Sequence, residues 1–386
     1  MNILIIEDNS DKADEIENSI VSTLPLNSFI VEKVGAINDG ILALARTNFD
    51  LVIADLVLPQ IRGALETCDA TSQWCDYIQS ERSVRLSTWI VMTGFESIVD
   101  NARSIFSRFG VAVIEYEKGG YWTEVLKGRL IEHYVNRPLD FIIICALAKE
   151  RAGFDTVDGV KIGEYSQVAG LDCQSIELGA LRGAIIVLPE PGLVPASIAT
   201  TKATALFKPK IIAMAGICGG MQGESELGDI IAPDVAWNYQ TGKIVHGCLI
   251  PELMQTPVPP NTKTLLHQLS NAEYSLKLRS GLFHSELKHR GIHVTAMVSG
   301  SPVIADANEA LKIATQSRKI GGLDMEVSAV FAASHDFFNG GGAFFAAKVV
   351  VDLASDKKDD RYHEYGCVLA ARFTIDTIRA LASAAI

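Results

Sequence analysis

The feature that most constrains the fold of this chain is a repeated alternation, over residues 2 to about 135, of short apolar runs with amphipathic stretches. The five runs are rich in β-branched and aromatic residues and occupy 3–6, 29–32, 51–54, 89–92 and 111–114. Short strands that alternate with helical patterns predict a doubly wound α/β domain built on a parallel sheet. Ligands of such sheets bind outside the carboxyl ends of the strands.

The chain is too long for this domain alone. Its 386 residues exceed what one hydrophobic core usually supports, and 48% hydrophobic residues with 21% charged residues are typical of a fully globular protein. Pro138 interrupts the helical pattern of 125–134, and a new apolar strand begins at 141–145. We therefore expect two domains, 1–136 and 137–386, joined by a short connection.

Charge and hydropathy exclude several classes of function. The net charge is −12 and basic residues are not clustered, so the phosphate backbone of a nucleic acid would be repelled. The first apolar run passes at once into Glu7 and Asp8, which is too short for a signal peptide, and no segment has the roughly 18 apolar residues of a membrane helix. The seven cysteines are odd in number and scattered. We expect a soluble cytoplasmic protein with reduced, buried thiols.

Polar residues follow the strands of the first domain where a ligand site is expected. Glu7 and Asp8 follow the first run, Asp55 the third, Thr93 the fourth and Lys118 the fifth. Three clustered carboxylates repel one another unless a hard cation lies among them, and Mg²⁺ prefers such oxygen ligands. Glu7, Asp8 and Asp55 are therefore predicted to hold Mg²⁺.

These positions resemble the receiver domain of two-component response regulators, over the whole first domain. The resemblance implies a flavodoxin-like fold in which Asp55 is phosphorylated by a cognate sensor histidine kinase, Thr93 acts as a hydroxyl switch and Lys118 pairs with the phosphoryl oxygens. Two departures stand out: Gly119 replaces the usual proline, and residues 59–85 are longer than usual. The helix after Asp55 is expected to start late or to follow an insertion.

Three segments of the second domain, 145–150, 321–329 and 349–352, resemble the catalytic and ribose-binding parts of the nucleoside phosphorylase and nucleosidase superfamily. The similarity continues through 210–221, 226–233 and 298–304 and covers about 140–384. It implies an α/β domain with a mixed central sheet and no cofactor.

Hydrolysis of an N-glycosidic bond requires an acid for the leaving base, stabilisation of the sugar cation and a positioned water. The resemblance implies that Asp352 protonates purine N7, that Glu326 binds the ribose hydroxyls with Met325 packed on the sugar, and that Glu150 orients or activates water. It assigns further substrate contacts to Gly216, Ile217, Cys218, Val303 and Ile304.

The acceptor and the substrate are less constrained. Pro191, Gly192 and Ile217 stand where phosphorylases use serine or arginine, which favours water over phosphate. Lys357, Lys358 and Arg361 follow the proposed acid. They either balance neighbouring aspartates on a solvated loop, or Lys358 and Arg361 bind a 5′ phosphate chain.

The order of the two domains resembles the effector of the bacterial anti-phage two-component systems called Detocs. That resemblance implies an ATP nucleosidase that is activated when Asp55 is phosphorylated. The alternatives are a nucleoside phosphorylase or an AMP or methylthioadenosine nucleosidase under receiver control, and, from another class, a purine sensor without turnover. A homo-oligomer is also expected by resemblance, with a contribution from residues 237–259, including Lys243 and His246.

Overall fold

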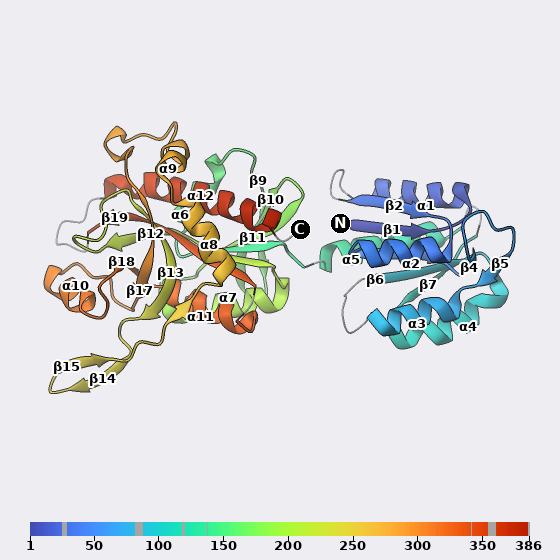
Figure 1. The fold of residues 1–386 in the computed structure, drawn as a ribbon, viewed down its shortest axis with the longest axis horizontal. Helices are drawn as coiled ribbons and strands as arrows, with labels where there is room; N and C mark the ends of the chain where they lie inside the picture. The colour runs from blue at the N-terminus through green and yellow to red at the C-terminus, as the bar shows by residue number, and fades with distance from the viewer. Residues whose placement is uncertain are drawn as a thin grey trace. The chain divides into compact units, whose positions relative to one another are not determined.

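The computed structural model describes residues 1–24, 29–81, 88–117, 120–136, 138–340, 342–353 and 360–384. They form two compact units, Met1–Arg137 and Pro138–Ile386 (Figure 1). The sequence predicts the boundary between residues 136 and 137. Each unit has its own sheet and its own buried core.

The N-terminal unit is built on a five-stranded parallel sheet with the order β2-β1-β3-β6-β7. Read along the chain this is 2-1-3-4-5, one of the two common orders of doubly wound sheets. The strands are β1 (Asn2–Ile6), β2 (Ile30–Val34), β3 (Leu51–Asp55), β6 (Thr88–Thr93) and β7 (Ala112–Glu115). The helices are α1 (Ser10–Thr23), α2 (Ile37–Arg46), α3 (Thr71–Glu81), α4 (Glu96–Phe106), η1 (Ser107–Phe109) and α5 (Trp122–Asn136).

Alternate residues of the central strands face opposite helical layers. Leu4 and Val52 pack in the same cluster as residues of α2, α3 and α4, whereas Ile3 and Leu51 pack with residues of α1 and α5. Because side chains of a strand point alternately to the two faces of the sheet, a nearly continuous apolar run is what a strand covered on both sides requires.

A short antiparallel hairpin separates β3 from the next helix. It consists of β4 (Val57–Pro59) and β5 (Thr67–Asp69), and α3 begins only at Thr71. The predicted late start of this helix is confirmed. Lys118 and Gly119, the expected lysine and the substituted proline position, lie outside the described residues.

The C-terminal unit has a ten-stranded mixed sheet among the described residues, as the α/β prediction requires. Its strands are β8 (Phe141–Cys145), β9 (Lys161–Val168), β10 (Leu171–Leu178), β11 (Leu181–Val187), β12 (Ile211–Gly220), β13 (Ile230–Asn238), β16 (Thr256–Pro257), β17 (Ile292–Ser299), β18 (Ile320–Asp324) and β19 (Ala343–Asp352). β12, β19, β13, β17 and β18 pair in a closed circuit. The closed circuit gathers the ends of several strands in a small space.

Helices cover both faces of this sheet (Figure 1). They are α6 (Ala148–Ala152), η2 (Gly153–Thr156), α7 (Leu193–Phe207), α8 (Pro260–Leu269), α9 (Ala272–Leu278), η3 (Ser285–Leu287), α10 (Ala307–Ala314), α11 (Val327–Phe337), η4 (Asp360–Tyr362) and α12 (His363–Ala384). Ile211 and Ala213 of β12 pack in the cluster that contains α12, while Ile212 and Met214 pack in the cluster that contains α7 and α11. Alternate side chains of β12 therefore pack into two different hydrophobic cores, one on each face of the sheet.

A second hairpin, β14 (Gly242–Val245) and β15 (Cys248–Pro251), extends as an arm from the C-terminal unit (Figure 1). Ile244 and Ile250 on this arm are 75% and 55% exposed. All seven cysteines are free thiols, but Cys248 on the arm is exposed, so the expectation that the thiols are buried is wrong there. The described part of the chain contains no helix that is long and apolar enough to cross a membrane.

Candidate functional sites

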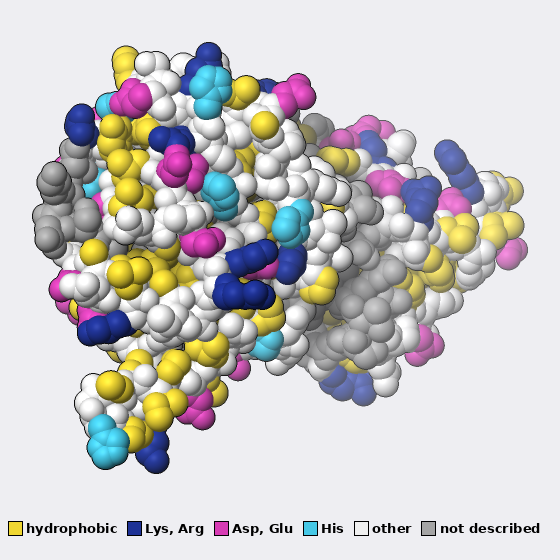
Figure 2. Space-filling model, turned by 60° about the vertical axis from the view of Figure 1, so that its left-hand side comes forward, with side chains coloured by type: hydrophobic (Ala, Val, Ile, Leu, Met, Phe, Trp, Pro, Cys, Tyr) yellow, Lys and Arg dark blue, Asp and Glu magenta, His cyan; other side chains and the backbone are white. Residues whose placement is uncertain are grey.

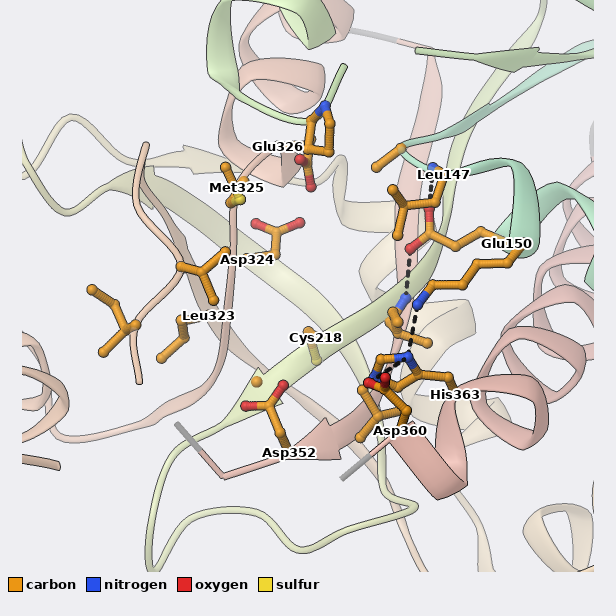
Figure 3. A pocket seen from close by; sticks show the side chains of 18 of the residues that line it. Leu147, Glu150, Cys218, Leu323, Asp324, Met325, Glu326, Asp352, Asp360 and His363 are labelled. Atoms are coloured by element: carbon orange, nitrogen blue, oxygen red, sulfur yellow. Dashed lines mark hydrogen bonds and ion pairs between the residues drawn. The ribbon is translucent and has the colours of Figure 1, made fainter. Parts of the chain in front are cut away.

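The principal cavity of the C-terminal unit has a volume of about 270 Å³ and lies at the ends of β12, β18 and β19 (Figure 3). Its predicted lining residues are Glu150, Ile217, Cys218, Val303, Ile304, Met325, Glu326 and Asp352, joined by Leu147, Lys149, Gly219, Leu323, Asp324, Asp360 and His363 among others. Six elements (α6, β12, β18, β19, η4 and α12) and the loop after β17 therefore bring residues more than 200 positions apart to one place.

Glu150 is buried at the start of α6, where it connects this helix to β12. Its Oε2 accepts a hydrogen bond from Leu147 N at 3.0 Å, and its Oε1 accepts one from Ile217 N at 2.9 Å. The first bond satisfies a free N–H at the helix start. The second fixes the carboxylate beside the strand end that lines the cavity.

Gly216 has a structural role beside the cavity, although it is not among the described residues that line it. A Cβ at this position would lie 2.0 Å from Glu150 Oε1. The glycine therefore makes room for the Glu150 carboxylate. The predicted substrate contact at Gly216 stays a prediction.

Asp324, which sequence reasoning did not select, caps α11. Its carboxylate accepts hydrogen bonds from Val327 N at 3.2 and 3.1 Å and from Ser299 Oγ at 2.7 Å. Ser299 Oγ in turn accepts a hydrogen bond from Ser328 N at 2.9 Å. Glu326 occupies the formal N-cap position of α11 but makes no side-chain cap bond, which leaves its carboxylate for the cavity.

Glu326 is a buried carboxylate with few fixed partners. Gly192 N donates to its Oε1 at 2.9 Å, and Lys348 Nζ lies 3.7 Å from its Oε2. Burial raises the pKa of Glu326 to about 7, Lys348 opposes that rise, and the neighbouring Asp324 and Glu150 carboxylates add to it. The group is thus tuned to titrate near neutral pH, as is common at functional sites.

Lys348, in the middle of β19, is the second residue that the sequence did not reveal. It is fully buried, and its Nζ lies 3.2 Å from Asp324 Oδ2. Burial disfavours its charged form, but the Asp324, Glu150 and Glu326 carboxylates outweigh burial and keep the pKa of Lys348 above its usual range. Among the described residues it has no hydrogen-bond partner of good geometry. A buried ammonium with unused donors can hold the charge of a carboxylate or bind a ligand oxygen.

Asp352 ends β19 at an irregular point of the sheet. The pairing of β12 with β19 shifts so that Cys218 faces Val350 and Gly219 faces Asp352. Such bulges redirect side chains next to active sites. A Cβ on Gly219 would lie 3.1 Å from Asp352 Oδ1, so the glycine leaves room for the half-buried carboxylate (Figure 3).

A polar group at the cavity wall joins α6 to the start of α12. Lys149 Nζ lies 2.7 Å from His363 Nδ1, and the same histidine nitrogen is 3.3 Å from Asp360 Oδ1 (Figure 3). Arg361 is not among the described lining residues, and its guanidinium lies 5.3 Å from the Tyr362 ring centroid. Lys358 lies outside the described residues. Among the described residues, Lys149 and His363 are the basic side chains that line the cavity. The predicted Arg361 contact with substrate stays a prediction.

The N-terminal unit holds a second acidic cluster at the carboxyl ends of β1 and β3. One carboxylate oxygen of each of Glu7, Asp8 and Asp55 lies within 4.8 Å of the others. Lys12 Nζ lies 2.7 Å from both Glu7 Oε2 and Asp55 Oδ2. Burial and the Asp55 charge raise the pKa of Glu7 to about 7 although Lys12 opposes the rise.

Thr93 is fully buried at the end of β6, where its hydroxyl oxygen accepts a hydrogen bond from Phe95 N at 3.2 Å.

The model of the phosphorylase superfamily matches residues 140–382. The chain belongs to the phosphorylase superfamily. The match spans nearly all of the C-terminal unit and includes the whole cavity wall described above.

Two relatives and one solved structure are similar to this chain. An uncharacterized protein, y4jS of Sinorhizobium fredii, is 26% identical and matches over 97% of this chain and 98% of its own length. The ATP nucleosidase Cap17 of Escherichia coli is 23% identical over 66% of this chain, which spans 54% of the length of Cap17. A Helicobacter pylori methylthioadenosine nucleosidase mutant with methylthioadenosine in its active site aligns with a TM-score of 0.51 at 13% identity, covering 63% of this chain and 99% of that chain. At this identity, the structural similarity establishes the fold alone.

Proposed function

We propose that the C-terminal unit is a purine nucleotide nucleosidase, which hydrolyses the N-glycosidic bond of ATP to adenine and ribose 5′-triphosphate. The observation that carries the proposal is that Glu150, Glu326 and Asp352 come from different elements and line one cavity beside the buried Lys348. An acid, a sugar-binding carboxylate and a water-binding carboxylate are the groups that this reaction needs. The similarity to Cap17 supports ATP as the substrate.

Each carboxylate would have one task in this reaction. Asp352 gives a proton to N7 of the purine as the bond from the anomeric carbon to the base nitrogen breaks. Glu326 accepts hydrogen bonds from the ribose hydroxyls and stabilises the positive charge on the sugar. The water oxygen bonds to the anomeric carbon, and the proton that water loses balances the one that Asp352 gave to the base.

Glu150 can position this water without losing its structural bonds. Each of its oxygens accepts one backbone N–H, and a carboxylate oxygen has a second lone pair for another donor. Lys348 lies too deep to supply the proton of the leaving base, but its charge keeps carboxylates together that would otherwise repel one another. We assign it a positioning role.

The basic pair at the cavity wall supports a nucleotide over a nucleoside. Lys149 and His363 lie 2.7 Å apart and both line the cavity. A lysine ammonium is a common phosphate ligand. The pair would therefore bind the 5′ phosphate chain, which is one of the two roles that the sequence left open for Lys358 and Arg361.

The experiment that tests the activity is chromatography of ATP, AMP, adenosine and methylthioadenosine after incubation with the full chain in phosphate-free buffer. Adenine from ATP is the expected product. Release of base only after phosphate is added would make the protein a nucleoside phosphorylase, and release from AMP or methylthioadenosine alone would change the substrate. Purine binding without any release, together with unchanged binding by Asp352→Asn, would support a purine sensor.

We further propose that the N-terminal unit is a receiver domain that controls this activity in a cytoplasmic, bacterial anti-phage defence protein. A sensor histidine kinase would be the partner that phosphorylates Asp55, with Thr93 and Lys118 as switch residues. The strand order 2-1-3-4-5 and the acidic cluster at the strand ends support this assignment. Because ATP hydrolysis of this kind would harm the host, a low activity before phosphorylation is expected.

The receiver proposal implies Mg²⁺, and the donor set fits this ion. Oxygens of Glu7, Asp8 and Asp55 lie within 4.8 Å of one another, and carboxylate oxygens are the ligands that Mg²⁺ takes. When bound, the ion would offset the charge of the incoming phosphoryl group. The chain's own task is to present the Asp55 carboxylate at the end of β3 and to hold its Oδ1 by the 2.6 Å bond from Leu56 N.

The control of activity is tested by adding a small phosphodonor with Mg²⁺. Base release should rise with the donor in the parent protein, and Asp55→Asn should abolish that rise. A shift from about 1% to 99% active molecules requires roughly 5.5 kcal/mol of differential stabilisation. An equal rate with and without the donor would contradict the receiver proposal and leave the nucleosidase proposal intact.

A homo-oligomer is also proposed, formed through the β14–β15 arm. Figure 2 shows apolar side chains along this arm with basic ones near its end, and Lys243 and His246 belong to it. An apolar groove at its base is lined by Val194, Ile198 and Met254, which are 67%, 52% and 73% exposed. Exposed apolar surface of this kind marks interaction sites. Light scattering should give a multiple of the chain mass, and Ile250→Asp should reduce it.

A further inference from the structure

The acidic cluster of the N-terminal unit contains a lysine that no part of the proposed function uses. Lys12 lies in the first turn of α1, where Asn9 caps the helix by accepting hydrogen bonds from Asp11 N and Lys12 N. The side chain is only 7% exposed. Its Nζ lies 2.7 Å from Glu7 Oε2 and 2.7 Å from Asp55 Oδ2, and 5.1 Å from the Tyr116 ring centroid.

The ammonium therefore occupies one oxygen of each of two carboxylates that a divalent cation would use. The other oxygen of each carboxylate accepts a backbone N–H group, since Glu7 Oε1 accepts from Asn9 N at 3.1 Å and Asp55 Oδ1 accepts from Leu56 N at 2.6 Å. Asp8, the third carboxylate of the cluster, is exposed. A cation that binds this cluster must therefore compete with Lys12 for two of its three carboxylates, Glu7 and Asp55.

We propose that Lys12 is a built-in competitor of the divalent cation at Glu7, Asp8 and Asp55, so that the cation binds only when the Lys12 ammonium leaves. Two cations that contact the same two carboxylates repel each other, and this repulsion is strongest where water is excluded. The lysine stem is flexible and stands at the start of a helix, so the ammonium can move without unfolding α1.

The consequence is a threshold for activation, and it rests on the proposed receiver function. If phosphorylation of Asp55 depends on the cation, Lys12 raises the cation concentration at which Asp55 becomes reactive. The lysine would then protect the cell from accidental activation of a harmful nucleosidase. The competition itself is a property of metal binding and can be measured without phosphodonor or nucleotide.

The test compares Mn²⁺ binding by the full-length parent protein with that of Lys12→Met and Lys12→Arg. Free Mn²⁺ is measured by electron paramagnetic resonance, and Mg²⁺ is then added to displace it. Lys12→Met should bind one Mn²⁺ at least about tenfold more tightly than the parent, because the competing charge is gone while the methionine keeps the length of the side chain. Lys12→Arg keeps the charge and should not gain affinity.

Two further variants define the site. Lys33→Met removes another lysine of the N-terminal unit, one that bridges Asp14 and Glu17 on the surface at 2.7 Å, and should bind Mn²⁺ as the parent does. Glu7→Gln should weaken binding in both the parent and the Lys12→Met background. Equal or weaker Mn²⁺ binding by Lys12→Met than by the parent overturns the proposal.

Lys12→Met leaves two buried carboxylates without their cation, so its stability is measured as well. Thermal unfolding with and without Mg²⁺ should show a larger stabilisation by Mg²⁺ in Lys12→Met than in the parent, since a ligand that binds the folded state more tightly stabilises it more. Equal shifts in both proteins would also contradict the competition. If Asp55 phosphorylation leaves base release unchanged, the proposed receiver function is wrong. The proposed competition between Lys12 and the cation is not affected by that result.

Discussion

Each unit of this protein places a buried lysine among carboxylates, and the two lysines are held differently. Lys12 contacts Glu7 and Asp55 at 2.7 Å each. Lys348 lies 3.2 Å from Asp324 and 3.7 Å from Glu326, without a hydrogen-bond partner of good geometry among the described residues. In both sites burial raises the pKa of one glutamate, Glu7 or Glu326, to about 7.

The difference lies in the elements that carry the two side chains. Lys12 stands at the start of a helix, so its ammonium can leave the acidic cluster. Lys348 stands in β19, whose neighbours on both sides are strands, and it is fully buried. As proposed above, the first site is an exchangeable ion pair and the second is a fixed charge beside the cavity of the C-terminal unit.

The largest expected effect is that of Asp352→Asn, which differs from the effect of Asp55→Asn in the other unit. Asp352→Asn should lower the rate of base release by roughly 10² to 10⁴, the usual contribution of a general acid, while ATP still binds. Asp55→Asn should abolish only the increase caused by a phosphodonor. Single-turnover release of adenine, measured with and without the donor, checks both. A wild-type rate for Asp352→Asn would remove Asp352 from the reaction.

Removal of each lysine should sharpen the comparison. Lys348→Met leaves Asp324 and Glu326 buried without a cation, and the loss of one partner from a buried ion pair costs about 3–5 kcal/mol of folding stability. Mg²⁺ should not restore this loss. Lys12→Met should regain much of its stability when Mg²⁺ is added. Urea unfolding of both variants with and without Mg²⁺ is the measurement, and rescue of Lys348→Met by Mg²⁺ would contradict the distinction.

The pH dependence of activity should reflect the ionisation of the Glu326 carboxyl group. In the proposed mechanism its ionised form accepts hydrogen bonds from the ribose, and burial raises its pKa to about 7. The ionisation of Glu326 should therefore make kcat/KM rise with pH below 7. Folding stability should move in the opposite direction, since the folded state keeps this proton up to about pH 7 and the unfolded state releases it near 4.5. Glu326→Gln should lose this rise in its residual activity.

The smallest expected effect concerns the lysine at the cavity wall. Lys149 is exposed, so Lys149→Ala should change stability little. The same change should lower kcat/KM for ATP relative to adenosine by roughly tenfold, the worth of one good charged contact. His363→Ala should act in the same direction. An unchanged ratio of ATP to adenosine would remove the pair from phosphate recognition.

Much of the fold follows from patterns that are local in sequence. The apolar runs predicted the strands of the first sheet to within about two residues, because a strand covered on both faces needs almost every residue to be apolar. The late start of α3 follows from the long segment after Asp55. Motifs of the superfamily pointed to Glu150, Glu326 and Asp352, which do line one cavity.

Other residues became visible only in three dimensions. Gly216 makes room for Glu150, 66 residues away in sequence. Asp324 ends β18, Lys348 lies within β19 and Lys12 lies in the first turn of α1, and none of them was selected from the sequence. Each has partners from other elements, as in the Lys12–Asp55 contact across 43 residues.

The sequence by itself determined the α/β class, the two domains, the superfamily motifs and the residue types available for chemistry, because these depend on periodicity and on short segments. Only the tertiary structure decided which charges are buried, which carboxylates share a cation and which glycine meets which side chain. The physical reason is that the free energy of a charge depends on its solvent exposure and on neighbours within a few ångströms, and folding brings those neighbours from distant parts of the chain.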